Sequence, residues 1–462
     1  MTRHALALAA LCALAALPAP AVAQEKVLTL DQAIQAALRN NPQIVSARET
    51  VSATTSKVAE AKAGYLPSAS AILAYKRMTM NSAAIPTLGS TSVPANMSPQ
   101  TLALLEQISA MSTAEKQTFD SANSFSASLS VNQTIYDFGR TGGAYEASKA
   151  VVTAADADLK TARDAVYLSV VQSFFGVLAM QETVAVAAET RKQMEKHLEL
   201  AQAQVANGVR TKIDVTRAQS DLASANLSVI KAANALAVAR VNLNNAMGTP
   251  EAGDYRVERP PAAGAPAYAS AEEATREAIA RRPEFRSLQE KIRSLEASLV
   301  AVRSGYYPVI AANGGLTYSG YDLGGMVYNW QIGASATWNF FSGFYTQNTV
   351  QEVEATVRSL QAAVHSLELG IRLEIESAML AYREARESMT PAQALVNAAR
   401  ETLELGEARY AAGAGSIVEV TDAQSIYTQA RAGLIQAELN LETARARLLK
   451  AVGQIAVAKE GE

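Results

Sequence analysis

The chain has 462 residues, a formal net charge of −3 and a single cysteine, and aromatic residues make up only 6% of it. The balanced charge gives no basic surface for nucleic acid, so we exclude a nucleic-acid partner. One cysteine excludes a disulfide framework and a cysteine-ligated metal site. A composition rich in Ala, Leu, Glu, Gln and Arg and poor in aromatics is typical of long helices and coiled coils.

The first segment of the chain, residues 1–23, is predicted to be a secretory signal peptide. Basic Arg3 precedes an apolar run from Ala5 to Leu17, and Ala21-Val22-Ala23 forms a cleavage site of small residues. This run is shorter than the about 20 apolar residues that a spanning helix needs, which disfavours a membrane anchor. No later apolar run is seen to approach that length, so the sequence argues against a helical inner-membrane protein.

After the signal, the sequence contains two copies of one long unit. Gly64-Tyr65-Leu66-Pro67 recurs as Gly305-Tyr306-Tyr307-Pro308, and the segment from Tyr136 to Gly248 matches the segment from Phe341 to Gly453 without a gap. Two copies of this length are too few and too long for a solenoid. We interpret them as a duplicated unit of a pore-forming assembly.

The chain is divided accordingly into a signal peptide, two repeats, a linker and a tail. These segments are 1–23, a first repeat at 24–248, a linker or equatorial segment at 249–270, a second repeat at 271–453 and a tail at 454–462. In the first repeat we expect strands near 66–77 and 122–137, a long helix at 140–207 and a helix at 212–247. In the second we expect strands near 306–319 and 329–341, a long helix at 346–412 and a helix at 416–452.

The predicted strands have the pattern of a membrane barrel. In 124–136 and 329–340, apolar residues alternate with Ser, Thr, Asn and Gln. One polar, uncharged face with aromatics near the strand ends fits a membrane strand better than a strand of a soluble sandwich. Four strands cannot close a barrel, and an open sheet edge in lipid would leave backbone groups unpaired. Several copies of the chain must therefore share one barrel.

The first copy carries an insertion around 78–122, between its two strands. Ser98-Pro99 is predicted to start a short helix there, and Ser112-Thr113-Ala114-Glu115 has the pattern of a capping box for another. If the N-terminus is periplasmic, this insertion is extracellular.

The predicted helices carry an apolar seam. From Val215 to Ala246, and again from Val420 to Ala451, apolar residues are spaced alternately by three and four, with alanine at every second position. Such a seven-residue repeat predicts a left-handed coiled coil in which the helices approach closely. Each seam helix follows a much longer helix, so the sequence predicts two antiparallel helix pairs.

Three motifs carry a resemblance to a known family. The pattern Gly-x-x-[Ser/Thr]-x-[Ile/Val]-[Asp/Glu]-Val-x-x-Ala-Gln begins at Gly208 and again at Gly413. Gly-Tyr-x-Pro precedes a predicted strand in each copy, and Tyr136-Asp137-Phe138-Gly139 follows one. Over nearly the whole length after the signal, the chain resembles the TolC-like outer-membrane efflux protein family.

The resemblance implies an α+β membrane protein of the Gram-negative outer membrane that extends into the periplasm. It implies a homotrimer whose 12-stranded β-barrel, with four strands per chain, is continuous with a 12-helix periplasmic α-barrel. The implied function is the passive exit duct of a tripartite efflux or type I secretion system for small molecules or proteins. The implied partners are a periplasmic adaptor (membrane fusion) protein, an inner-membrane pump of the RND or ABC type and outer-membrane lipid; no cofactor is implied.

The two helix turns, near 208–214 and 413–422, resemble the family's periplasmic mouth. The resemblance implies gate or mouth lining for Asp214, Arg210, Tyr410, Glu419 and Asp422, and adaptor contact for Asn207, Gly208, Val209, Ala412, Gly413 and Ala414. In a trimer, Glu419 and Asp422 would form rings of like charge that favour cations. The alternative is that these acids are solvated residues at a helix start, and that each glycine only ends a helix.

One position departs from the family's pattern. The arginine that ties the family's gate would fall at Gly415, which has no side chain for a salt bridge. Arg210 and Lys212 are the nearby substitutes that the sequence offers.

Other functions have weaker support. His197 and His365 are isolated on long helices, and the sequence has no phosphate-binding loop, nucleophile elbow or metalloprotease motif. We therefore expect no enzyme, no catalytic residue and no metal site. A periplasmic coiled-coil adaptor or structural protein without a pore remains an alternative, although such a protein should have one hairpin rather than duplicated strand–helix units.

Overall fold

The structure is a computed structural model that describes residues 26–79, 98–111, 121–208, 211–250, 255–261, 264, 268 and 270–455. The signal peptide, Val209, Arg210, the capping box expected at Ser112–Glu115 in the insertion, much of the linker and most of the tail lie outside the described residues. The chain divides into two compact units. The first comprises Met1–Ser56, Lys149–Ser294 and Thr356–Glu462, and the second comprises Lys57–Ser148 and Leu295–Ala355.

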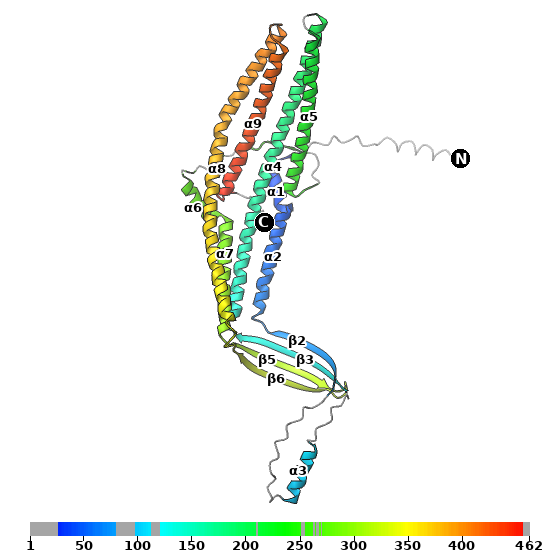
Figure 1. Cartoon of the computed structure of the whole chain (residues 1–462), viewed down its shortest axis with the longest axis vertical. Helices are drawn as coiled ribbons and strands as arrows, with labels where there is room; N and C mark the ends of the chain where they lie inside the picture. Colours follow the sequence, from blue (N-terminus) through cyan, green and yellow to red (C-terminus); the bar gives the residue numbers. More distant parts are fainter. Residues whose placement is uncertain are drawn as a thin grey trace, which may run out of the picture. The chain divides into compact units, whose positions relative to one another are not determined.

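The second unit holds a four-stranded antiparallel sheet in the order β2-β3-β5-β6 (Figure 1). The strands are β2 (Ser68–Thr79), β3 (Ser121–Tyr136), β5 (Val309–Gly320) and β6 (Val327–Thr337). β6 ends earlier than the expected boundary near 341, and Tyr306 lies in a short 3₁₀ turn rather than in a strand. The turn forms because Tyr307 donates its backbone N–H to the carbonyl of Ser304, at 3.0 Å.

Four long helices form two hairpins, and most of their residues belong to the first unit (Figure 1). α4 (Arg140–Ala206) is followed by α5 (Lys212–Met247), and α8 (Tyr345–Ala411) by α9 (Ile417–Ala451). α4 and α8 have 67 residues each, which corresponds to about 100 Å of helix. Pro391 lies inside α8 without ending it.

The apolar seam of each hairpin is packed as its spacing predicts. In α5 the buried seam residues are Ala218, Ala225, Ala232, Leu243 and Ala246. In α9 they are Val420, Ala423, Tyr427, Ala430, Ala437, Ala444, Leu448 and Ala451. The other seam residues, all of them described, are half-buried. Small side chains let the helices approach, and the backbone of α9 at Glu419 and Val420 lies about a van der Waals distance from the position of a Cβ on Gly406 of α8.

Five shorter helices complete the helical part of the described chain. They are α1 (Leu30–Asn40), α2 (Pro42–Ala63), α3 (Pro99–Met111), α6 (Ala271–Arg281) and α7 (Pro283–Arg303). Thr29 and Gln32 form a capping box at the start of α1, and Ser270 accepts from the backbone of Glu273 at the start of α6. α3 starts where Ser98-Pro99 predicts, whereas the sequence analysis did not foresee the other four.

A short segment crosses the hairpins near the start of α1. β4 (Tyr255–Val257) pairs in parallel with β1 (Lys26–Leu28). We call residues 255–261 the belt segment. Val257 is 2% exposed and belongs to a core with Phe174 of α4 and Leu243 of α5.

Helices α4 and α5 differ from expectation in one respect. Each contains 18 consecutive residues with mean hydropathy 1.4, apolar and long enough to cross a membrane by length and composition alone. The expectation that no run after the signal approaches this length was therefore wrong. In α5 the seam contributes to this stretch, because it concentrates alanine, valine and leucine, whereas the apolar residues of α4 include the buried core residues Val170, Phe174 and Val177.

Candidate functional site: an amphipathic sheet and two helix tips

One face of the four-stranded sheet is apolar across all four strands, up to the end of β2, where Arg77 and Thr79 lie on it. The strand register places Ala71, Leu129, Leu316 and Trp330 in one row. The next row is Ala69, Val131, Gly314 and Ile332. Residues that lie opposite one another in neighbouring strands point to the same face. Trp330 and Ile332 are 72% and 84% exposed, so none of the described residues covers this face at these two positions.

The opposite face is polar and largely uncharged. One of its rows contains Ser70, Ser130, Gly315 and Gln331. The hydroxyls of Ser70 and Ser130 lie 2.8 Å apart, and Asn313 donates to Ser335 over 3.2 Å. Among the described strand residues on this face, Lys76 carries the charge, close to the end of β2. A sheet with these two faces is suited to separate lipid from water.

Aromatic side chains gather at both ends of the sheet. Toward one end, the rings of Tyr75 and Phe125 lie 5.0 Å apart and those of Tyr318 and Tyr328 lie 5.8 Å apart. At the other end, Phe138 stacks on Tyr307 at 4.9 Å, and Trp338 lies 6.3 Å from Phe340. Trp338 also donates its indole N–H to the carbonyl of Tyr306, at 3.1 Å. Aromatic residues at both ends of an apolar band are typical of strands that span a membrane.

The first helix tip joins α4 to α5. Gly208 has φ +71°, a left-handed conformation that favours glycine, and Asn207 beside it is exposed. Asp214 accepts from the backbone N–H and the hydroxyl of Thr211, both at 3.3 Å. The carboxylate of Asp214 therefore caps α5, and this capping is a structural task in addition to any role at the mouth.

The second helix tip joins α8 to α9 and has the same form. Gly413 has φ +76°, and Ala412 and Ala414 beside it are exposed. Ser416 accepts from the backbone N–H of Glu419 at 3.2 Å and so caps α9. A side chain at Gly415 would place its Cβ 3.1 Å from the nitrogen of Tyr410, so the turn is too tight for a larger residue without adjustment.

The acidic residues after the second tip are exposed, whereas the aromatic one is not. Glu419 and Asp422 are both exposed. Tyr410 is 1% exposed and lies in a core with Leu403, Val420 and Ala423. The structure thus brings Tyr410 into the packing of the hairpin, while the two carboxylates lie at its surface.

A basic residue that the sequence motifs do not include lies at this tip. Arg409 Nη1 lies 3.4 Å from Glu419 Oε1. Arg409 therefore supplies a cation at the turn of Gly415, where the sequence had suggested only Arg210 and Lys212 as substitutes. The pair forms because the tight turn brings the last turn of α8 beside the first turn of α9. The only hint of this ion pair in the sequence is that Arg409 directly precedes Tyr410, one of the residues expected at the mouth.

Polar contacts join the two hairpins near their tips. His197 Nε2 on α4 lies 3.4 Å from Glu407 Oε1 on α8, and Thr421 on α9 donates to Asp221 on α5 over 3.2 Å. Burial lowers the pKa of His197, although the neighbouring Glu407 and Asp221 oppose this shift. His197, which is 8% exposed, is therefore a packed residue between hairpins rather than an isolated one.

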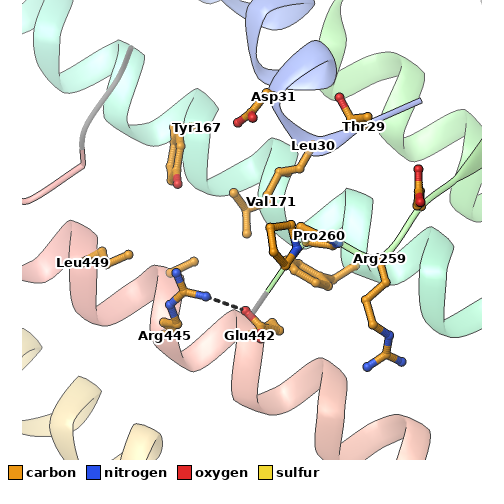
Figure 2. A pocket seen from close by; sticks show the side chains of 14 residues that line it. Thr29, Leu30, Asp31, Tyr167, Val171, Arg259, Pro260, Glu442, Arg445 and Leu449 are labelled. Atoms are coloured by element: carbon orange, nitrogen blue, oxygen red, sulfur yellow. Dashed lines mark hydrogen bonds and ion pairs between the residues drawn. The ribbon is translucent and has the colours of Figure 1, made fainter. Parts of the chain in front are cut away.

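A pocket of about 490 Å³ opens beneath the belt segment, and Figure 2 shows its lining. α4 contributes Tyr167, Val171 and Phe175, and α9 contributes Glu442 and Arg445. Arg445 Nη1 pairs with Glu442 Oε2 at 3.1 Å. In Figure 2 Pro260 lies beside Val171, and the guanidinium of Arg259 points away from Arg445. The belt segment therefore crosses from α4 to α9 at this level.

The two-faced sheet and the helical hairpins define the class of a membrane channel, and comparisons with known proteins identify the family. The model of the outer membrane efflux protein family matches residues 33–249 and 274–454, which is most of the chain. The chain belongs to this family. It is a transport protein of the Gram-negative outer membrane that extends into the periplasm, and not an enzyme. The resemblance to TolC-like proteins is thereby confirmed.

Relatives in the family are distant in sequence. A probable outer membrane lipoprotein, SilC of Salmonella typhimurium, is 22% identical over 65% of this chain and 66% of its own length. Outer membrane protein OprJ of Pseudomonas aeruginosa is 25% identical over 38% of each chain. The structure of the CmeC outer membrane channel of Campylobacter jejuni covers 92% of this chain and 85% of its own, with TM-score 0.74 and 17% identity. This last likeness shows the fold.

Proposed function

We propose that the protein is the passive exit duct of a tripartite efflux or type I secretion system. In this proposal three copies form one 12-stranded barrel and one 12-helix tunnel, and each repeat supplies two strands and two long helices. The observation that carries the proposal is the four-stranded sheet with one continuous apolar face, one polar face and two open edges.

The open edges support the trimer. β2 and β6 are the outer strands of the sheet, and among the described residues each has one side without a strand partner. In lipid, every unpaired backbone N–H and C=O costs several kcal/mol. Pairing β6 of one chain with β2 of the next removes these groups, and three chains supply the twelve strands that the family resemblance implies.

The polar face supports a water-filled conduit. If Trp330 and its row face lipid, then Ser70, Ser130 and Gln331 face the lumen. Side chains without charge bind neither anions nor cations strongly, so the barrel would pass solutes without strong selection. The exposed carboxylates of Glu419 and Asp422 would then form the charged part of the route, as a mouth that favours cations.

The helix tips support contact with a partner. Gly208 and Gly413 leave their backbones bare, since, apart from their chain neighbours, no described residue has an atom within 4 Å of the position of a Cβ on either. We propose that a periplasmic adaptor contacts Asn207, Gly208 and Val209 on one tip and Ala412, Gly413 and Ala414 on the other. An inner-membrane pump of the RND or ABC type would supply the energy, because the duct carries no nucleotide-binding motif.

Light scattering on the detergent-purified protein tests the proposed assembly. We expect the mass of three chains, and conductance when the same sample is added to a planar bilayer. A monodisperse folded monomer would contradict the proposal, because one chain cannot close its sheet. A trimer without conductance would contradict the duct while leaving the shared barrel intact.

A further inference from the structure

Arg259 on the belt segment bridges two carboxylates that belong to different hairpins. Its Nη2 atom lies 2.5 Å from Glu182 Oε1 on α4 and 2.6 Å from Glu438 Oε2 on α9. The hydrogen bonds that Arg259 donates to Glu438 and Glu182 raise the pKa of Arg259, so the guanidinium stays charged. One cation thus holds together two acids that would otherwise repel each other.

The belt segment is fixed to the hairpin of α4 and α5. Tyr255 donates its hydroxyl to Asn244 Oδ1 of α5, at 2.8 Å, and Val257 is buried against both helices. Two consecutive prolines, Pro260 and Pro261, follow Arg259 and restrict its backbone to extended conformations. Arg259 therefore extends from a rigid support on the first hairpin to Glu438 on the second.

The interface between α4 and α9, which joins the two hairpins, changes from apolar to mostly polar contacts close to this bridge. Phe175 packs against Ala446 on the side toward the middle of α4, whereas Ala179 and Val186, one on each side of Glu182, pack against Ile435. These contacts are apolar and hold α4 and α9 together by burial.

Toward the tips, the contacts across this interface between the hairpins become mostly polar. Glu189 lies 3.6 Å from Arg431, and the hydroxyls of Thr190 and Thr428 lie 3.3 Å apart. The pair of His197 and Glu407 follows further along, with Leu200 as an apolar neighbour of the α8–α9 core. When the hairpins separate, polar contacts of this kind can be replaced by hydrogen bonds to water at little net cost in free energy. Exposing buried apolar side chains to water has no such compensation.

We propose that Arg259 is the fixed point about which the channel opens, and we call this role the fulcrum. Arg259 fixes the spacing of α4 and α9 close to the end of their apolar contacts, so that the tips can part while these two helices stay together at the level of Arg259. The inference rests on the proposed duct and adds a residue that controls its closed state. Glu182 and Glu438 are the two anchor points, and Arg259 is a positioning residue that does not touch the cargo.

Removing the guanidinium should replace an attraction between the two hairpins by a repulsion. In Arg259→Ala, the carboxylates of Glu182 and Glu438 face each other with no cation between them, and like charges at such separations repel. The repulsion acts between the two hairpins and favours their separation. It should weaken in concentrated salt, because the Debye length falls from about 10 Å at 0.1 M to about 3 Å at 1 M.

Closed-state conductance in planar bilayers tests the fulcrum, with each trimer first verified by light scattering. We expect Arg259→Ala to leak several-fold more than the wild type in 0.1 M KCl, and less so in 1 M KCl. Adding Glu182→Gln and Glu438→Gln to Arg259→Ala should return the leak toward the wild-type level. Arg256→Ala removes an exposed arginine of the same belt segment and should leave the conductance unchanged.

Two results would overturn the fulcrum. The first is an Arg259→Ala trimer that conducts like the wild type. The second is a leak that persists unchanged when both glutamates are neutralised, since that would indicate a general loss of packing. A wild-type trimer that never conducts would instead count against the duct itself, so the two failures are distinguishable.

Discussion

Arg409 Nη1 lies 3.4 Å from Glu419 Oε1, across the turn that joins α8 to α9. Both side chains are well exposed, so this pair adds little to stability, about 0–1 kcal/mol. Its consequence is electrostatic. Arg409 partly neutralises one of the two acids proposed for the mouth, whereas Asp422, also exposed, projects from the same end of α9.

The first prediction concerns these two acids. Glu419→Ala combined with Asp422→Ala should reduce the preference for cations and raise conductance, because two rings of negative charge are removed from the narrowest part of the proposed route. The reversal potential in a KCl gradient across a planar bilayer measures the effect. Glu401→Ala, which removes an exposed acid from α8, is the matched control. Unchanged selectivity in an assembled double-variant trimer would show that these acids are only solvated residues at a helix start.

The second prediction concerns the helix tips. Gly413→Glu should abolish export in a complementation assay while leaving the trimer in the membrane. At φ +76° a side chain costs on the order of 1 kcal/mol, which is too little to unfold a trimer held by long seams. The added side chain would hold the adaptor away from the bare backbone.

Gly413→Ala separates backbone strain from bulk at the same position. It carries the same strain and little bulk, so we expect it to retain most export. If Gly413→Glu exports as well as the wild type, the adaptor must bind elsewhere. The same comparison can be repeated at Gly208, whose φ is +71°.

The third prediction concerns pH and Asp164 of α4. Burial, together with the nearby Glu284, raises the pKa of Asp164 from 3.8 to about 6, although Lys450 and Arg282 oppose the shift. A carboxyl whose pKa is raised on folding destabilises the folded state as pH rises from about 4 through 6. Asp164→Asn should therefore raise the melting temperature at pH 8 and change it little at pH 4.

Asp156→Asn is the control for this experiment, because Asp156 is an exposed acid on the same helix. It should have little effect at either pH. A lower melting temperature for Asp164→Asn at pH 8 would mean that Lys450 and Arg282 need the charge of Asp164 more than burial penalises it.

Local patterns made part of this structure predictable. The seam from Val215 to Ala246 repeats within one helix, so its packing follows from the sequence alone. The alternation in β3 and β6 likewise locates the strands, and Gly208 and Gly413 mark both turns. The pattern could not place the end of β6, because Trp338 and Phe340 continue the alternation beyond the last paired residue, Thr337.

Other features depend on distant residues and left little or no local signal. α2 left only a weak one: Ile44, Val51 and Val58 recur every seven residues, but Ile44 is its one buried residue and the other two are half-buried. The belt segment has a strand of three residues that pairs with Lys26–Leu28, far away in the chain. Arg259 contacts Glu182 and Glu438 only after both hairpins have packed, and the residues next to Arg259 in the sequence do not indicate these contacts.

The fourth prediction uses the only two tryptophans of the chain, Trp330 and Trp338. They are eight residues apart on the same side of the strand pattern, or about 26 Å along an extended chain. With a strand tilt of about 40°, they would lie near opposite surfaces of the membrane. In Trp330→Phe and Trp338→Phe, the remaining indole should be quenched most by lipids brominated close to the head group. A single-tryptophan variant that no brominated lipid quenches would mean that protein covers this face.

The fifth prediction compares two neighbouring residues of β6 that point to opposite faces. Ile332 is 84% exposed on the apolar face, and Gln331 lies on the polar face in the row of Ser70 and Ser130. If the apolar face contacts lipid, Ile332→Lys buries a charge in hydrocarbon at a cost of about 2–4 kcal/mol near the bilayer midplane. In Gln331→Lys, the same charge would lie in the water of the lumen at little cost.

The amount of heat-stable trimer in the outer-membrane fraction measures this difference. We expect a strong loss for Ile332→Lys and near wild-type amounts for Gln331→Lys. Because the two variants add the same side chain to adjacent positions of one strand, general effects of lysine on strand formation cancel in the comparison. Gln331→Lys should also shift ion selectivity toward anions, since three added cations would line the lumen. The opposite ranking would reverse the proposed orientation of the sheet, and equal losses would mean that neither face is open to water.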